Sequence, residues 1–309
     1  MEKILQWSTA QQSDDPTVRA SVPSPDPKVL AQVLGADTGK DDVTLMKEDI
    51  SVLVCDDPQI SIDDKLTALE DFEMLIQNLD NANNISPMGI WPEIIKLYSY
   101  NGEEQNEFRS LAALITGTAV QNNTKCQNDF LNIAGENGFN NLLKLISKSN
   151  DFNVRARSLY ALSGLIAHNG ALYELFVKSD GWKQLEIVLS EDFQNDKKDN
   201  KVLLRSLNLL KSLLYDEIVE ENGKINTAKE DRFKKVSENG ISLSLLKKLS
   251  PSSHFDVNER IINIIAYVAQ NNYKFSQLEL DSLKNSLTRI SSIKNNLNES
   301  EISLLQKLL

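Results

Sequence analysis

A short pattern recurs along this 309-residue chain: a glycine, an apolar residue, and then a stretch rich in Leu and Ile. It begins at Gly89, Gly138, Gly181 and Gly240, at intervals of 49, 43 and 59 residues. A second marker, Arg-Ser-Leu, begins at Arg109, Arg157 and Arg205, 48 residues apart each time, and Arg260 opens a similar segment. We expect each of these arginines to start a long helix, so the spacing predicts one structural unit repeated along the chain.

Within the repeats the apolar residues follow helical spacing, and no convincing alternating strand pattern is found anywhere. Ser61 and Asp64 predict a capping box at the start of the first long helix. Aromatic residues are only 6% of the chain, which also favours helix over strand. Helical repeats of about 40 to 47 residues are typical of HEAT and armadillo arrays. An irregular helical bundle, which also uses glycine caps, is the alternative.

The chain divides by composition into three segments. Residues 1–40 hold four of the eight prolines among Ser and Asp, and they predict a flexible segment with short helices. Residues 41–290 are predicted to form the repeat array, in which a charged insertion near 216–238 widens the last interval. Residues 291–309 are predicted to form a C-terminal capping helix.

Charge and composition exclude several classes of protein. A net charge of −11 argues against a chain that mainly neutralises nucleic acid or anionic lipid. Two cysteines, Cys55 and Cys126, make neither a disulfide framework nor a zinc motif, and we expect unreactive thiols. No apolar run approaches ~18 residues and no signal peptide is recognisable, so we expect a cytoplasmic protein. No motif typical of an enzyme, cofactor site or metal site is present.

Several blocks, in order along the chain, resemble one family. They are MEKILQW (1–7), PDPKVLAQVLG (25–35), DDVTLMKEDISVL (41–53), FEMLIQNLDNANNI (72–85) and GTAVQNN (117–123). Together they resemble the fungal cytosolic armadillo-type nucleotide exchange factors of DnaK-type, seventy-kilodalton heat-shock chaperones. The resemblance spans the chain and is strongest over residues 1–125. It implies an all-α, armadillo-like solenoid with a flexible N-terminal segment.

The resemblance also implies a mechanism without catalysis. The array clamps one lobe of the chaperone's nucleotide-binding domain and displaces the other, so that ADP leaves and ATP can enter. The N-terminal segment, with Leu5 and Trp7 as apolar anchors, is implied to assist client release. Further implications are a monomer, ribosome-associated chaperones among the partners, and a role in translation regulation.

Candidate contact residues follow from the same motifs. They are Ala82, Asn83 and Asn84, expected at the end of the first long helix, then Gln121, Asn122, Asn123 and Arg205. A small Ala82 would allow close approach, and a guanidinium at Arg205 could form a bidentate pair with a carboxylate. Helix capping explains the asparagines equally well. Arg109 and Arg157 are expected to form salt bridges within the array, and His168 to be a structural cap.

A generic armadillo scaffold that binds an extended peptide remains the alternative function. Scaffolds that bind basic peptides carry repeated Trp and Asn ladders. Here Trp91 and Trp182 stand beside glycines at helix starts, so no such ladder is evident. Nothing positive favours an enzyme.

Overall fold

The computed structural model describes residues 39–148, 150–215, 218–219, 225–226 and 229–309. The chain forms two compact units, residues 1–48 and 49–309, and the boundary falls within α4 (Asp42–Val54). In the first unit, Lys40 Nζ lies 2.6 Å from the Glu48 carboxylate. The second unit contains the repeats, and everything below concerns that unit.

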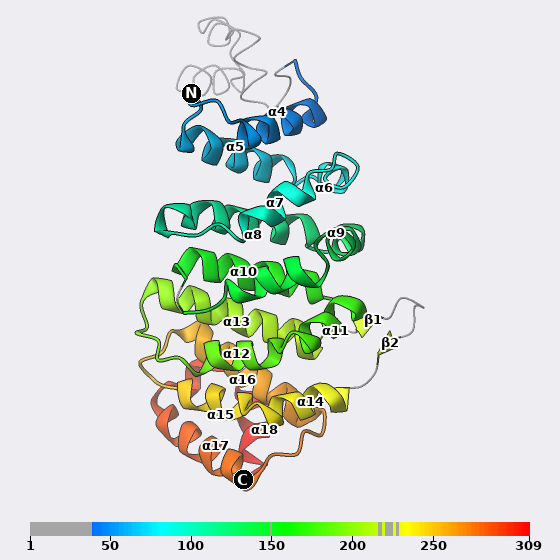
Figure 1. Ribbon diagram of the computed structural model, residues 1–309. Coiled ribbons are helices and arrows are strands. Elements are labelled where there is room, and N and C mark those ends of the chain that lie inside the picture. The colour runs from blue at the N-terminus through cyan, green and yellow to red at the C-terminus, as the bar shows by residue number, and fades with distance from the viewer. Residues whose placement is uncertain (1–38, 149, 216–217, 220–224, 227–228) are drawn as a thin grey trace, which may run out of the picture. The chain divides into compact units, whose positions relative to one another are not determined.

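Four repeats consist of a short first helix, a second helix and a long third helix (Figure 1). One long helix, α5 (Ile62–Leu75), precedes the first repeat and begins at the predicted Ser61–Asp64 capping box. The elements that follow are α6 (Leu79–Asn84), α7 (Trp91–Leu97), η1 (Glu103–Gln105) and α8 (Asn106–Val120); α9 (Thr124–Lys144) and α10 (Phe152–Ile166); α11 (Gly170–Lys178), α12 (Gly181–Ser190) and α13 (Lys197–Tyr215); α14 (Lys229–Glu238), α15 (Ile241–Lys248) and α16 (Phe255–Gln270); and α17 (Gln277–Arg289), η2 (Ser291–Asn296) and α18 (Glu299–Gln306). In the second repeat the first two helices are joined at Gly135 into α9, and α17, η2 and α18 follow the fourth repeat. Three helices per repeat is the armadillo arrangement, and the predicted all-α solenoid is confirmed.

The third helices pack side by side in chain order. Thus α5 contacts α8, α8 contacts α10, α10 contacts α13, and α13 contacts α16. Their inward side chains are completely buried, for example Ile115, Leu162 and Leu210. We call the solvent side of α5, α8, α10, α13 and α16 the third-helix face. Because neighbours hold each of these helices along its length, the face is a rigid platform.

Left-handed residues end several long helices, as the Asn-rich segments predict. Asn122, His168 and Asn272 follow α8, α10 and α16 with φ of 52°, 59° and 65°. The next residue then caps the following helix in two cases: the side chains of Asn123 and Asn169 accept hydrogen bonds from backbone N–H groups of α9 and α11. The change of direction at these two junctions therefore takes only three residues, 121–123 and 167–169.

The structure corrects three local predictions. In the second repeat the break comes at Gly135 (φ 53°), whereas the predicted Gly138 lies within the helix. Arg205 is in the middle of α13 and not at its start, because α13 begins eight residues earlier than the Arg-Ser-Leu marker suggests. Residues 79–84 form a separate short helix, because α5 ends at Leu75.

The insertion near 216–238 also departs from the prediction, because it contains strand. Ile218–Val219 (β1) pairs antiparallel with Ile225–Asn226 (β2), with Val219 opposite Ile225. Two-residue strands are too short to show an alternating pattern in a sequence. The rest of the described insertion is α14, the first helix of the fourth repeat.

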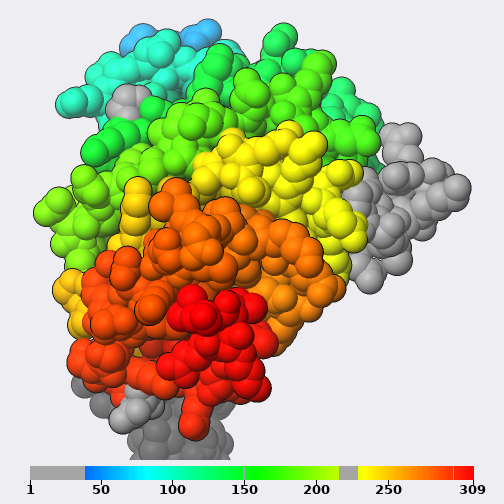
Figure 2. Space-filling view, turned by 90° about the horizontal axis from the view of Figure 1, so that it is seen from below, coloured from blue at the N-terminus to red at the C-terminus, as the bar shows by residue number. Residues whose placement is uncertain are grey.

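The C-terminal segment lies over the last third helix. Figure 2 shows α18, in red, against the orange segments that precede it, and α18 contacts α16. Ile302 and Leu305 of α18 are buried. In the part of the chain that the structure describes, no helix is both long and apolar enough to cross a membrane.

A buried carboxylate joins the fourth repeat to α17. Glu279, 4% exposed, accepts hydrogen bonds from the Tyr273 hydroxyl (2.7 Å), the Ser276 backbone N–H (2.7 Å) and the Ser242 hydroxyl. Burial alone would raise the pKa of Glu279, but these hydrogen bonds outweigh it and hold the pKa below its usual 4.5. The ionised form is therefore the one that the fold stabilises.

Glu279→Gln is expected to lower the free energy of unfolding at pH 7 by about 2 kcal/mol. A depressed carboxyl pKa contributes stability above the unfolded pKa, and this stability is lost as pH falls through the folded pKa. The difference between wild type and variant should thus shrink below about pH 4. Urea unfolding at pH 7 and pH 3.5 measures it, with exposed Glu103→Gln as the control. A difference independent of pH would contradict the assignment.

Candidate functional site

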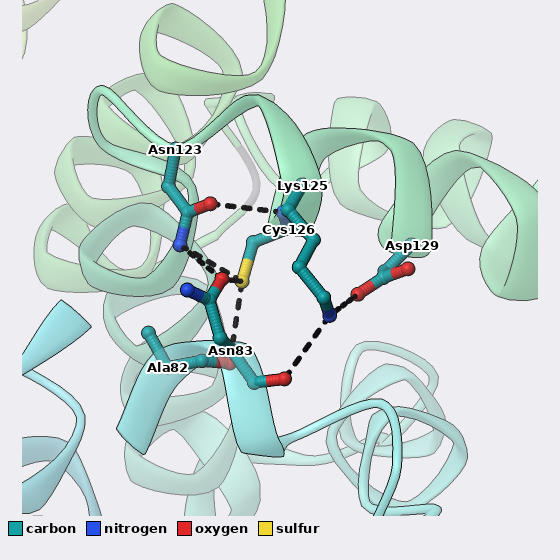
Figure 3. A network of polar contacts seen from close by, with 6 residues as sticks. All are labelled: Ala82, Asn83, Asn123, Lys125, Cys126 and Asp129. Atoms are coloured by element: carbon teal, nitrogen blue, oxygen red, sulfur yellow. Dashed lines mark hydrogen bonds and ion pairs between the residues drawn. The ribbon is translucent and has the colours of Figure 1, made fainter. Parts of the chain in front are cut away.

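Three of the predicted contact residues meet where α6 adjoins the start of α9 (Figure 3). Asn123 Nδ2 donates to Asn83 Oδ1 at 3.2 Å, and Lys125 Nζ donates to the Asn83 carbonyl at 3.1 Å. Lys125 also pairs with Asp129 at 2.7 Å. Ala82 is 2% exposed, and its carbonyl accepts a bond from the Cys126 thiol. Contrary to our expectation, Ala82 therefore offers no side-chain surface for close approach.

The next repeat contains the same inter-repeat bond. Asn169 Nδ2 donates to Asn128 Oδ1 at 3.1 Å, as Asn123 does to Asn83. Both donors cap a first helix, and both acceptors lie on the first helix of the preceding repeat. Asn83 and Asn123 thus contribute to the packing between repeats. Any contact that they make with a partner would have to be compatible with this bond.

The Cys126 thiol lies in the middle of this junction. Its side chain is fully buried, and burial raises the thiol pKa to about 11. A thiol with so high a pKa is a poor nucleophile at neutral pH. This agrees with the expected unreactive cysteine.

Two other predicted residues come together on the third-helix face, through a residue that the sequence analysis missed. The Tyr160 hydroxyl of α10 donates to Gln121 Oε1 at 2.6 Å. The Arg205 guanidinium of α13 lies over the same ring, 4.7 Å from its centroid. Burial raises the pKa of Tyr160, so its hydroxyl keeps the proton that it donates. Tyr160 therefore links three consecutive repeats.

A hollow of about 640 Å³ opens beside this cluster. It is lined by Glu73 of α5, by Gln77 just after that helix, by Leu114 and Thr118 of α8, and by Gln121, Asn122, Tyr160 and Arg205. Both carboxylate oxygens of Glu73 are occupied, one by the Thr118 hydroxyl (2.7 Å) and one by the Gln77 amide (3.2 Å). Gln121 and Asn122 are exposed, so their amides face solvent at the rim.

Gly117 of α8 makes room for Tyr160. A Cβ atom on Gly117 would overlap the Tyr160 ring, with Cε1 only 2.6 Å away. Glycine costs a helix interior about 1 kcal/mol relative to alanine. Its presence in the GTAVQNN segment is therefore explained by the ring that lies against it. The sequence does contain one signal that could have identified Tyr160. Tyr160 directly follows the repeated Arg-Ser-Leu, whereas the small Ala112 stands at the same position in α8.

The structure places the remaining candidates elsewhere. Asn84 is half-buried at the end of α6, and Leu5 and Trp7 lie outside the described residues. The salt bridges expected of Arg109 and Arg157 are not found in the described part of the chain. Arg109 instead donates to Asn150 Oδ1, and Arg157 to Ser110 Oγ at 3.0 Å.

Cys126 should resist thiol reagents in the folded protein. With a pKa of about 11, roughly one thiol in a thousand is ionised at pH 8, and burial blocks access further. In a Cys55→Ser background, labelling of Cys126 should be at least about a thousandfold slower in native buffer than in urea. Equally fast labelling in both would show that the α6–α9 junction is open.

Comparison with known proteins agrees with this architecture. The profile described as nucleotide exchange factor Fes1 matches residues 1–85, and the one described as SIL1/FES1/HPBP1 C-terminal domain matches residues 81–305. The Hsp70 nucleotide exchange factor FES1 of Saccharomyces cerevisiae is 34% identical over 302 residues, covering 97% of each chain. The FES1 protein of Scheffersomyces stipitis is 35% identical and covers 100% of this chain and 99% of its own.

Solved structures show the same fold at low identity. A designed armadillo repeat protein in complex with the peptide (KR)4 is 14% identical, with a TM-score of 0.61 over 84% of this chain and 96% of its own. The SYS-1/POP-1 complex is 15% identical, with a TM-score of 0.56 over 85% of this chain and 47% of the matched chain. The two profiles together cover nearly the whole chain, and full-length relatives exceed 30% identity. The chain therefore belongs to the Fes1 family of Hsp70 nucleotide exchange factors.

Proposed function

We propose that this protein binds the nucleotide-binding domain of cytosolic DnaK-type chaperones through its third-helix face and accelerates ADP release. Family membership over the full length supports the activity. The observation that carries the location is the Gln121–Tyr160–Arg205 cluster, a preorganised polar surface that spans three repeats. Release of client polypeptide would follow once ATP replaces ADP.

Such a factor needs no catalytic group. It binds more tightly to the chaperone conformer that has a low affinity for ADP than to the ADP-bound conformer. The size of this preference limits how much it can weaken ADP binding. Every 1.4 kcal/mol of that difference weakens ADP binding about tenfold. A rigid array meets this requirement because it cannot adjust its shape to fit both conformers equally.

The candidate residues take different parts in this proposal. Arg205 would bind a carboxylate of the chaperone, because its position over the Tyr160 ring holds the guanidinium in place and leaves N–H groups for a partner. Gln121 and Asn122 would bond partner backbone from the rim. Ala82, Asn83 and Asn123 would act indirectly, by holding the first repeat against the second. Asn84 would present its amide at the end of α6.

Other parts of the proposal rest on the family resemblance alone. These are the client-release role of Leu5 and Trp7, the monomeric state, the cytoplasmic location, the ribosome-associated partners and the link to translation. The alternative of a scaffold for basic peptides is less well supported, because Arg205, Lys211 and Arg260 make part of the third-helix face cationic.

Stopped-flow release of labelled ADP tests the activity. Micromolar factor should accelerate release at least about tenfold. Arg205→Ala should weaken chaperone binding about 10- to 100-fold, and Arg205→Lys should recover only part of it, since lysine lacks the planar fork. Lys183→Ala, which removes an exposed cation from α12, is the matched control. Unchanged ADP release with wild-type factor would refute the function, and wild-type binding by Arg205→Ala would refute the site.

Gly117→Ala tests the positioning of Tyr160. The new methyl group should displace the ring, and with it Arg205 and Gln121, and so weaken chaperone binding about tenfold. In a Tyr160→Ala background the same substitution should have little further effect, because the ring that it displaces is gone. Gly164→Ala, whose Cβ would meet Val120 at 3.1 Å, is the control for alanine in a neighbouring third helix. Additive effects of Gly117→Ala and Tyr160→Ala would contradict this role.

A further inference from the structure

Two adjoining hollows lie on the third-helix face over α10, α13 and α16. Their volumes are about 440 and 660 Å³, and both are lined by Arg205 and Asn208. No carboxylate lines either hollow among the described residues. Five permanent cations do, and we call them the cationic groove: Lys197, Lys201, Arg205, Lys211 and Arg260.

Neutral groups hold three of these cations in place. Arg205 lies over the Tyr160 ring, and Lys211 Nζ is 5.4 Å from the centroid of the Tyr215 ring. Arg260 donates to Asn208 Oδ1. An aromatic face or an amide oxygen orients a cation without cancelling its charge. Within the described ranges, none of the five forms an ion pair, whereas lysines on other surfaces do, such as Lys178 with Glu136.

The local concentration of positive charge opposes stability. Partial desolvation and repulsion from Arg157, Arg205 and Lys197 lower the pKa of Lys201. Lys197 also opens α13, where the helix dipole favours a carboxylate, such as Asp199 of the same turn, over a cation. On a chain with a net charge of −11, folding does not explain such a cluster. A ligand that neutralises it does.

Carboxylates occupy the other end of the same face. Glu73 lines the hollow next to α5, and another hollow, between the starts of α8 and α10, is lined by Glu103, Glu104, Glu107 and Asp151 together with Arg157. The third-helix face thus changes sign along the array, from acidic over α5 and α8 to basic over α13 and α16. A chain of phosphates would be repelled at one end, whereas a protein surface can carry both signs.

We infer that the cationic groove binds a carboxylate-rich patch on the chaperone's nucleotide-binding domain, and that the change of sign along the face sets the direction in which the domain docks. This inference rests on the proposed function and extends it from Arg205 to Lys197, Lys201, Lys211 and Arg260. Opposite charges steer the encounter from a distance, so the groove acts mainly on the association rate.

The test is the double variant Lys197→Gln/Lys201→Gln, with Lys234→Gln/Lys235→Gln on α14 as a control that changes the net charge equally. Association and dissociation rates with the chaperone domain are measured between about 50 and 300 mM salt. The groove variant should associate about tenfold more slowly at low salt, with a shallower salt dependence and an unchanged dissociation rate. Its thermal midpoint should equal or exceed that of wild type, since repulsion is relieved. The control should match wild type.

Two results would overturn the inference. The first is equal rates and salt dependence for the groove and control variants. The second is binding of a single-stranded oligouridylate that is lost in the groove variant alone, which would assign the groove to nucleic acid. ADP release is also measured with wild-type factor from the same preparations. If the wild type accelerates ADP release but one of these two results is found, only the groove is refuted and the proposed function stands.

Discussion

The burial of the third helices against one another is the constraint on which the rest of the structure depends. A single triplet of helices leaves an apolar surface on each side, and only the next repeat covers it. Leu159, Leu162 and Leu165 of α10 are completely buried in this way. Each such side chain contributes roughly 2 kcal/mol by leaving water. The third-helix face is rigid because this packing holds the helices beneath it.

The junctions between repeats convert this packing into a regular array. A left-handed residue such as Asn122 or His168 ends one helix, and an asparagine immediately caps the next. The same capping asparagine also bonds to the preceding repeat. The capping asparagine therefore both starts the next helix and fixes its position against the preceding repeat.

The side chains that project from the third-helix face come from several repeats. Tyr160 holds Arg205 and Gln121 from two other repeats, and Gly117 gives it the space to do so. Beyond this cluster lie two hollows that, among the residues the structure describes, are lined by cations and by no carboxylate, although the chain as a whole is acidic. The Tyr160 cluster and the cationic groove therefore lie on one surface, the one that we propose binds the chaperone.

The sequence by itself determined the helical class, the array, the capping box at Ser61 and the turns at the Asn-rich segments, because these depend on local periodicity and local hydrogen bonds. The family also followed from sequence motifs. Only the tertiary structure decided that Ala82 is buried, that Arg205 lies in mid-helix, that the second break is at Gly135 and that β1 pairs with β2. Tyr160 was not identified either, because Gln121 and Arg205 lie about one repeat away from it in sequence, and the cationic groove was missed because it combines residues of α13 and α16. Such contacts arise from the register between stacked helices, which no local pattern records.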